Sequence, residues 1–372
     1  MKIIVSIIRI LTGALFIFSG LVKAIDPRGL AYKMQEFFEV FAREGYMPSL
    51  MDALSNHALT FSIIMITLEL VLGVALLVGW QKKLTTWLLL LLMLLFTFLT
   101  SYVLFSGKIE ACGCFGDCIP ITPIQTFTKD IILLVFVLIL LFSHKYIRPL
   151  NKPLILTLIV LASMIAVTAL QFYVLNHLPT FDCLPFKKGN NILELRKIPA
   201  DAVADEYAYS FIYEKNGARQ EFSAAELPDS TWVFSERKQT LVKKGKNNLP
   251  LINDFKLNTA EGVDSTDSIF GGQQKFYLFF LEFPSKHTDK WITDFKSFNA
   301  SNKGQAKIYI VTSQRSVAED LLSKNGIVVD GILTSDATAI KTAARSNPTL
   351  YLFAGPVVQQ KWGWADLKKV LK

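Results

Sequence analysis

The sequence predicts an all-α bundle of about five transmembrane helices, followed by a small β-rich connector and an α/β domain outside the membrane. Of the 372 residues, 51% are hydrophobic and only 19% are charged, which is more apolar than a soluble protein of this length requires. The excess lies within about residues 1–175, whereas the remainder has mixed charge and regular Gly and Pro punctuation. We therefore expect a membrane domain and then a soluble one.

Five apolar segments are long enough to cross a bilayer, which requires about 20 mostly apolar residues per helix. In the first of them Arg9 interrupts the apolar centre, and no small-residue cleavage site follows cleanly, so we expect a retained helix rather than a signal peptide. The segments begin at Ile3, Thr60, Leu84, Lys129 and Pro153.

Basic residues predict the direction of these helices. They gather after the second and fourth segments, and Lys2 precedes the first. The positive-inside rule places all three positions in the cytoplasm. Five crossings of a bacterial inner membrane then leave the cysteine loop over 107–128 and the C-terminal region in the periplasm, where disulfides persist.

Two charged residues interrupt the apolar spans. Arg9 lies in the first and Glu69 in the second, and counting about 1.5 Å per residue from the cytoplasmic ends puts them at similar depth. An intramembrane charge is costly unless it is paired. We therefore predict an intramembrane ion pair between Arg9 and Glu69, with a proton or substrate path as the alternative.

The four cysteines are the most informative residues. Cys112, Cys114 and Cys118 lie within "CGCFGDC", and Cys183 follows the fifth span. Three interpretations are open. The CxC pair can cycle between dithiol and disulfide; the thiolates can hold zinc or an iron–sulfur cluster, for which the spacing is unusual; or all four can form structural bridges. We predict no metal site.

The spacing favours one division of these cysteines. A bridge between Cys112 and Cys114 would be strained and easily reduced, whereas a bridge between Cys118 and Cys183 would close a long loop and resist reduction. Our hypothesis is that Cys112 and Cys114 are a redox-active pair and that Cys118 and Cys183 form a structural disulfide.

The region after the fifth span has two parts. Residues 179–250 contain "FIYEKNGARQEF", which is typical of a hairpin, and we expect this β-rich connector to hold the next domain away from the membrane. Over 251–372, apolar strand-like runs alternate with helical ones. That alternation predicts an α/β sandwich.

Several motifs together resemble a known family. "RILTGALFIFSGLVKAIDP", and "CGCFGD" followed by "FTKDIILL", are similar to the DoxX/MauE superfamily. The resemblance covers roughly residues 1–175, which is nearly all of the membrane domain, residues 1–178. With "HLPTFDCLPFKKGNNI" and "ARSNPTLYLF" added, the layout resembles DoxX-like proteins of Bacteroidota that carry a C-terminal thioredoxin-like domain. The resemblance implies a link to disulfide maturation and a likeness to quinone-linked thiol oxidoreductases such as VKOR and DsbB. It bears on Cys112 and Cys114 alone.

The C-terminal segment "SNPTLYLFAGPVVQQKWGW" resembles the part of thioredoxin in which a cis-proline precedes a strand. This resemblance makes Pro348 the candidate cis-proline. The segment after "YLFFLEF", where a thioredoxin has its CxxC, contains no cysteine. Without sulfur the domain has no thiol chemistry to perform, so we expect a binding or docking module.

Together these observations predict an inner-membrane redox-associated protein in contact with lipid. We expect it to exchange electrons between the pair formed by Cys112 and Cys114 and a periplasmic or membrane partner protein, which the thioredoxin-like domain docks. A membrane quinone is the candidate carrier. The alternative is a non-enzymatic assembly subunit of an envelope complex with structural disulfides, and whether the protein is an enzyme stays open. The net charge of +8 does not indicate nucleic acid, since no basic stripe with interleaved aromatic residues occurs.

Overall fold

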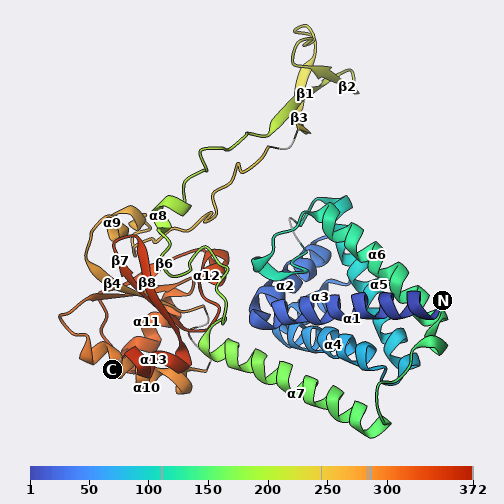
Figure 1. The fold of residues 1–372 in the computed structure, drawn as a ribbon. Helices are drawn as coiled ribbons and strands as arrows, with labels where there is room; N and C mark the ends of the chain where they lie inside the picture. Colours follow the sequence, from blue (N-terminus) through green and yellow to red (C-terminus); the bar gives the residue numbers. More distant parts are fainter. Residues whose placement is uncertain (110–111, 244, 283, 285–286, 371–372) are drawn as a thin grey trace.

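The computed structural model describes residues 1–109, 112–243, 245–282, 284 and 287–370. It contains a bundle of long helices, an α/β domain packed at one end of that bundle, and a slender antiparallel sheet that projects away from both (Figure 1). The order along the chain is the predicted one: membrane helices first, then a region rich in β-structure.

Five helices in the described part of the chain are long and apolar enough to cross a membrane, which confirms the predicted number. The fourth begins earlier than expected. The Thr122 side chain accepts a hydrogen bond from the Gln125 backbone amide, the Gln125 side chain accepts one from the Thr122 backbone amide, and Pro123 occupies the first turn, an arrangement that favours a helix start. The cysteine loop therefore ends at residue 122 instead of 128. The five helices are α1 (Lys2–Ile25), α4 (Ala58–Val78), α5 (Lys82–Ser106), α6 (Pro123–Phe142) and α7 (Pro153–His177).

Two shorter helices, α2 (Pro27–Arg43) and α3 (Pro48–Asn56), occupy the connection between the first two spans. The Asp26 side chain caps α2 by accepting a hydrogen bond from the Gly29 amide at 3.1 Å. These helices lie at the same end of the bundle as the cysteine loop and the α/β domain (Figure 1).

Small residues set how α1 and α4 pack. A Cβ atom at Gly73 would lie 2.9 Å from the Gly13 carbonyl oxygen, and one at Gly20 would lie 2.9 Å from Leu70 Cβ. Only glycine permits so close an approach of two backbones. These contacts determine which residues of the two antiparallel helices lie at the same level.

The α/β domain has a five-stranded sheet of order β6-β5-β4-β7-β8, in which β4, β5 and β6 are parallel and β7 is antiparallel to both of its neighbours. The Asn347–Pro348 peptide bond, directly before β7, is cis, as the resemblance implied. The strands are β4 (Lys275–Phe280), β5 (Lys307–Thr312), β6 (Gly331–Thr334), β7 (Thr349–Ala354) and β8 (Val357–Gly363); the helices are α9 (Thr266–Phe270), α10 (Thr288–Ser301), α11 (Arg315–Lys324), α12 (Ala337–Ala343) and α13 (Leu367–Val370).

Both faces of this sheet are covered. In β4, Leu278 and Phe280 belong to one buried cluster, and Phe279 belongs to the cluster on the other face, where it stacks on Phe295 of α10 with ring centroids 4.0 Å apart. A strand buried on both faces has a continuous apolar sequence. This explains the run "KFYLFFLEF".

The expected connector differs from the structure in two ways. Phe186 and Ile192 are buried in the core of the α/β domain, and the Ile192 amide, at the start of α8 (Ile192–Leu195), donates to the Pro356 carbonyl at 2.9 Å. The first part of the 179–250 segment therefore belongs to that domain, because its apolar side chains complete the domain core.

The second difference concerns the expected role of the connector as a spacer between the α/β domain and the membrane. β1 (Glu206–Lys215), β2 (Ala218–Ser223) and β3 (Val233–Lys243) form a sheet of order β2-β1-β3, which extends away from the rest of the molecule (Figure 1). It does not hold the α/β domain off the bundle. The expectation of a spacer was wrong, since residues of the domain bond directly to α2 and to the cysteine loop.

Candidate functional site

The cysteine loop brings two free thiols together. Cys112 is partly exposed and Cys114 is buried, and their Sγ atoms lie 3.3 Å apart. That separation is about 1.3 Å longer than a disulfide bond. Gly113, with φ of 71°, adopts the left-handed conformation that glycine favours, and it turns the chain between the two cysteines.

The other two cysteines are joined. Cys118 and Cys183 form a disulfide with a Cα–Cα distance of 4.9 Å, which is the pairing of our hypothesis. Cys118 ends a short 3-10 turn in the loop (Gly116–Cys118), and Cys183 follows α7. The bridge therefore fastens the cysteine loop to the chain that enters the α/β domain.

The two free thiols are not equivalent. The hydrogen bond between the two sulfurs lowers the pKa of Cys114, with help from the positive charges of Lys129 and Lys23, against the opposing effect of burial. The same bond, together with burial, raises the pKa of Cys112 well above its usual value. A thiolate is thus favoured at Cys114 over Cys112, and the thiolate is the nucleophile in disulfide exchange.

Charged side chains lie beneath the pair, inside the bundle. Lys23 donates to both carboxylate oxygens of Glu69, at 3.0 and 2.7 Å. Lys129 Nζ lies 2.8 Å from Asp130 Oδ1. Lys23, Glu69, Lys129 and Asp130 line a small cavity together with Cys114. The chain thus encloses a polar site at the thiol end of the bundle.

The predicted ion pair between Arg9 and Glu69 was wrong. Arg9 donates instead to three backbone carbonyls: Leu76 and Leu77 near the end of α4, at 2.8 and 2.6 Å, and Arg148, at 2.8 Å. The register set by the glycine contacts between α1 and α4 places Arg9 beside the free carbonyls at the C-terminus of α4. Counting from the helix ends failed because these ends are not level.

The α/β domain meets the cysteine loop through Arg345, which lies just before the cis-proline Pro348. Arg345 Nε is 2.9 Å from the Asp26 carboxylate, and its Nη2 donates to Asp117 of the loop at 2.6 Å. The Arg345 side chain is only 7% exposed. Burial raises the pKa of Asp26, and Arg345 opposes that effect.

A second contact involves the end of β4. Glu282 accepts hydrogen bonds from the Tyr32 hydroxyl at 2.9 Å and from Arg28 at 3.3 Å, both on α2. Burial raises the pKa of Glu282, against the effect of Arg28. The edge of the α/β domain that includes Pro348 thus faces α2 and the loop.

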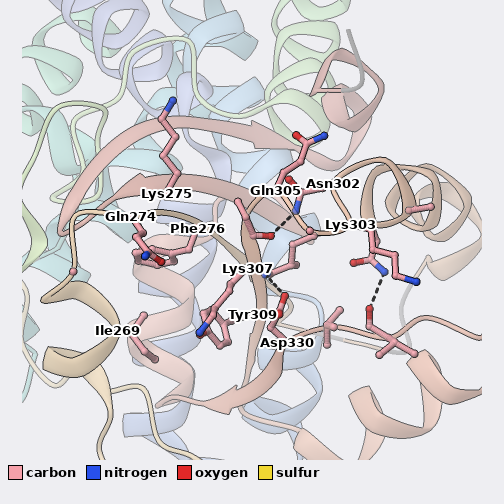
Figure 2. A pocket seen from close by; sticks show the side chains of 18 of the residues that line it. Ile269, Gln274, Lys275, Phe276, Asn302, Lys303, Gln305, Lys307, Tyr309 and Asp330 are labelled. Atoms are coloured by element: carbon pink, nitrogen blue, oxygen red, sulfur yellow. Dashed lines mark hydrogen bonds between the residues drawn. The ribbon is translucent and has the colours of Figure 1, made fainter.

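A broader depression of about 1100 Å³ lies at the opposite end of these strands, beside the starts of β4 and β5. Figure 2 shows its polar side chains from close by. Asp330 accepts from the Ile308 amide at 2.7 Å, and Asn302 donates to the Ala306 carbonyl at 2.6 Å. These bonds close turns of the domain. Within the described ranges, no three His, Cys, Asp or Glu side chains converge as metal ligands.

Sequence reasoning missed Lys23, Lys129 and Asp130. Each lies at the end of an apolar span, and a search for ionisable residues inside the spans would have found them. No sequence pattern indicated the contacts of Arg345 and Glu282, because the residues around each of them do not specify which residues of another domain they contact.

Five membrane helices with a dithiol loop at one end define a multi-pass membrane protein with potential thiol chemistry. Residues 1–143 match the family described as methylamine utilisation protein MauE, so the N-terminal part of the chain is a DoxX/MauE-like membrane domain. Residues 207–244, which cover the projecting sheet, match a domain of unknown function, DUF8463.

One curated relative is protein TlpB of Flavobacterium psychrophilum, which is 37% identical over 138 residues. The match covers 36% of this chain and 35% of the relative, so the chain spans about a third of that protein's length. No solved structure matches the chain.

Proposed function

We propose that the protein transfers electrons between the Cys112–Cys114 pair and the thiols of a partner protein. The observation that carries this proposal is the pair itself: two unbridged thiols with 3.3 Å between their sulfurs, one of them with a lowered pKa. A second pair in the same loop region is already committed to a disulfide, which leaves Cys112 and Cys114 for exchange.

The exchange moves two electrons and two protons. A thiolate of the reduced pair attacks a partner disulfide, so that one sulfur–sulfur bond breaks and a mixed disulfide forms. The other cysteine, once deprotonated, attacks the sulfur of its neighbour and releases the partner as a dithiol. The reverse sequence oxidises a partner dithiol, and a membrane quinone that takes two electrons and two protons would then restore the Cys112–Cys114 disulfide.

The α/β domain supplies the docking function in this proposal. Its cis-proline edge lies against the cysteine loop, so a partner held by the rest of the domain surface is brought close to the thiols. The loop between α5 and α6, which carries the thiols, and this domain lie at the same end of the bundle (Figure 1). We place that end in the periplasm of an inner membrane, where a disulfide such as Cys118–Cys183 persists.

The test is a redox titration in native membranes. Membranes are equilibrated across a series of thiol–disulfide buffers, and free thiols are trapped with a mass-shifting maleimide in wild type, Cys112→Ser and Cys118→Ser. We expect a Cys112–Cys114 bridge that titrates within the series, and a mixed disulfide with a partner at Cys114 when Cys112 is replaced. If Cys112 and Cys114 keep one redox state throughout and trap nothing, electron transfer is refuted in favour of an assembly subunit.

A further inference from the structure

Asp130 stands out among the buried groups of the bundle. Its side chain is 1% exposed, yet neither carboxylate oxygen has a hydrogen-bond partner among the described residues. Lys129 Nζ lies 2.8 Å from Oδ1, but without the orientation of a hydrogen bond. The ion pair with Lys129 offsets the charge of Asp130, but its oxygens lack the hydrogen bonds that a buried carboxylate usually accepts, and they can therefore bond to another group.

The cavity beside Asp130 supplies one. Its volume is about 20 Å³, which is room for roughly one water molecule. Its polar lining comes from four segments of the chain: α1, α4, the cysteine loop and α6. A buried water needs two to four polar partners, and this lining provides them. The polar residues that line it are Ser19, Lys23, Glu69, Cys114, Lys129 and Asp130.

The other charges around the cavity are already engaged. Lys23 and Glu69 neutralise each other through two hydrogen bonds, so Glu69 is not free to accept a proton without losing its partner. Ser19 donates to the Cys114 carbonyl at 3.1 Å. Asp130 is ion-paired with Lys129 but accepts no hydrogen bond among the described residues, whereas Glu69 accepts two, and Lys129 stabilises a negative charge on either Asp130 or Cys114.

We propose that Asp130 is the proton acceptor for the Cys112–Cys114 pair and acts through a water held in this cavity. The inference rests on the proposed thiol exchange and names the group that handles its proton. When Cys114 becomes a thiolate, its S–H bond breaks and the electron pair stays on sulfur. The water passes a proton on, and an O–H bond forms on Asp130. On return of the thiol, Asp130 gives the proton back.

Cys112 completes the relay. Its sulfur lies 3.3 Å from that of Cys114, and its proton leaves in the second step, when Cys112 attacks Cys114 in the mixed disulfide. By then Asp130 has passed the first proton to the thiolate released in the first step, so its carboxylate can accept the Cys112 proton and pass it to the second departing thiolate.

Two rates separate this role from a purely electrostatic one. The first is alkylation of Cys114 by iodoacetamide, which reports the thiolate fraction. The second is closure of the pair by hydroxyethyl disulfide, a small neutral oxidant, which also requires removal of the second proton. Both are measured in membranes between pH 5 and 9 for wild type, Asp130→Asn, Asp130→Glu and the control Asp52→Asn, which removes a carboxylate from the exposed face of α3.

We expect Asp130→Asn to speed alkylation, since the Asp130 charge raises the pKa of Cys114, and to slow closure at least about tenfold, as the loss of a general base does. Asp130→Glu should restore most of the closure rate, and Asp52→Asn should match wild type. If both rates rise together in Asp130→Asn, Asp130 acts only through its charge and the proposal is overturned.

Two further outcomes keep the test decisive. If Asp130→Asn does not insert, closure in wild type is compared in H₂O and D₂O; an unchanged rate contradicts a proton transfer in the limiting step. If the wild-type pair does not close with any disulfide, the proposed thiol exchange itself fails. Normal closure in Asp130→Asn would instead refute only the role of Asp130 and leave the proposed thiol exchange intact.

Discussion

The buried ion pair between Lys23 and Glu69 offers the sharpest test of the bundle structure. Each side chain is 4% exposed, so replacing Lys23 with Met leaves the Glu69 carboxylate uncompensated. Removing one partner of a buried pair costs about 3–5 kcal/mol. At about 2–4 °C per kcal/mol for a domain of this size, the lower figure corresponds to a loss of about 6–12 °C in Tm.

The assay is thermal unfolding in detergent micelles of the two single variants and the double variant. Replacing a whole buried pair is often nearly neutral, so Lys23→Met/Glu69→Gln should recover most of the loss and give a coupling energy of at least about 2 kcal/mol. As a matched comparison, Arg9→Met and Glu69→Gln should add within about 0.5 kcal/mol, because residues without contact behave independently. The register of α1 against α4 would be refuted if the stability changes of Lys23→Met and Glu69→Gln were additive while those of Arg9→Met and Glu69→Gln were coupled.

Three further predictions concern the thiol end of the molecule. Arg345→Met should weaken the contact between the α/β domain and the bundle by about 2 kcal/mol, a share of the cost of breaking a buried pair, seen as about 30-fold faster hydrogen exchange in α2; Arg219→Met, on the exposed sheet, should change nothing. Cys118→Ser opens a bridge between residues 65 apart and should cost about 4 kcal/mol in thermal unfolding of the full chain; equal stability would show that the bridge constrains little. Because the pKa of Cys114 is lowered, its alkylation should reach half its maximum at a lower pH than that of a cysteine in an unstructured peptide treated in the same way, and peptide mass spectrometry that finds an equal or higher midpoint would contradict the arrangement.

Most of the features that the sequence predicted correctly are local ones. A span is set by apolar side chains over about 20 successive residues, so five helices followed from hydropathy alone. The cis peptide before Pro348 was implied by a short motif. The disulfide between Cys118 and Cys183 followed from the order of the spans and the distance between cysteines.

The features that it missed depend on residues far apart in the chain. The partner of Glu69 is set by the register of α1 against α4, which the glycine contacts decide and hydropathy does not report. The place of Phe186 and Ile192 in the α/β core depends on the edge of β8. Sequence spacing alone could not distinguish a spacer from a part of that core.

The candidate site divides in the same way. The sequence by itself determined that two thiols lie next to each other at the end of a membrane bundle, because Cys112 and Cys114 are separated by one residue after an apolar span. Only the tertiary structure decided that Asp130 shares a cavity with Cys114 and that Arg345 reaches Asp117. Both are consequences of packing, in which distant segments meet at distances that no linear pattern specifies.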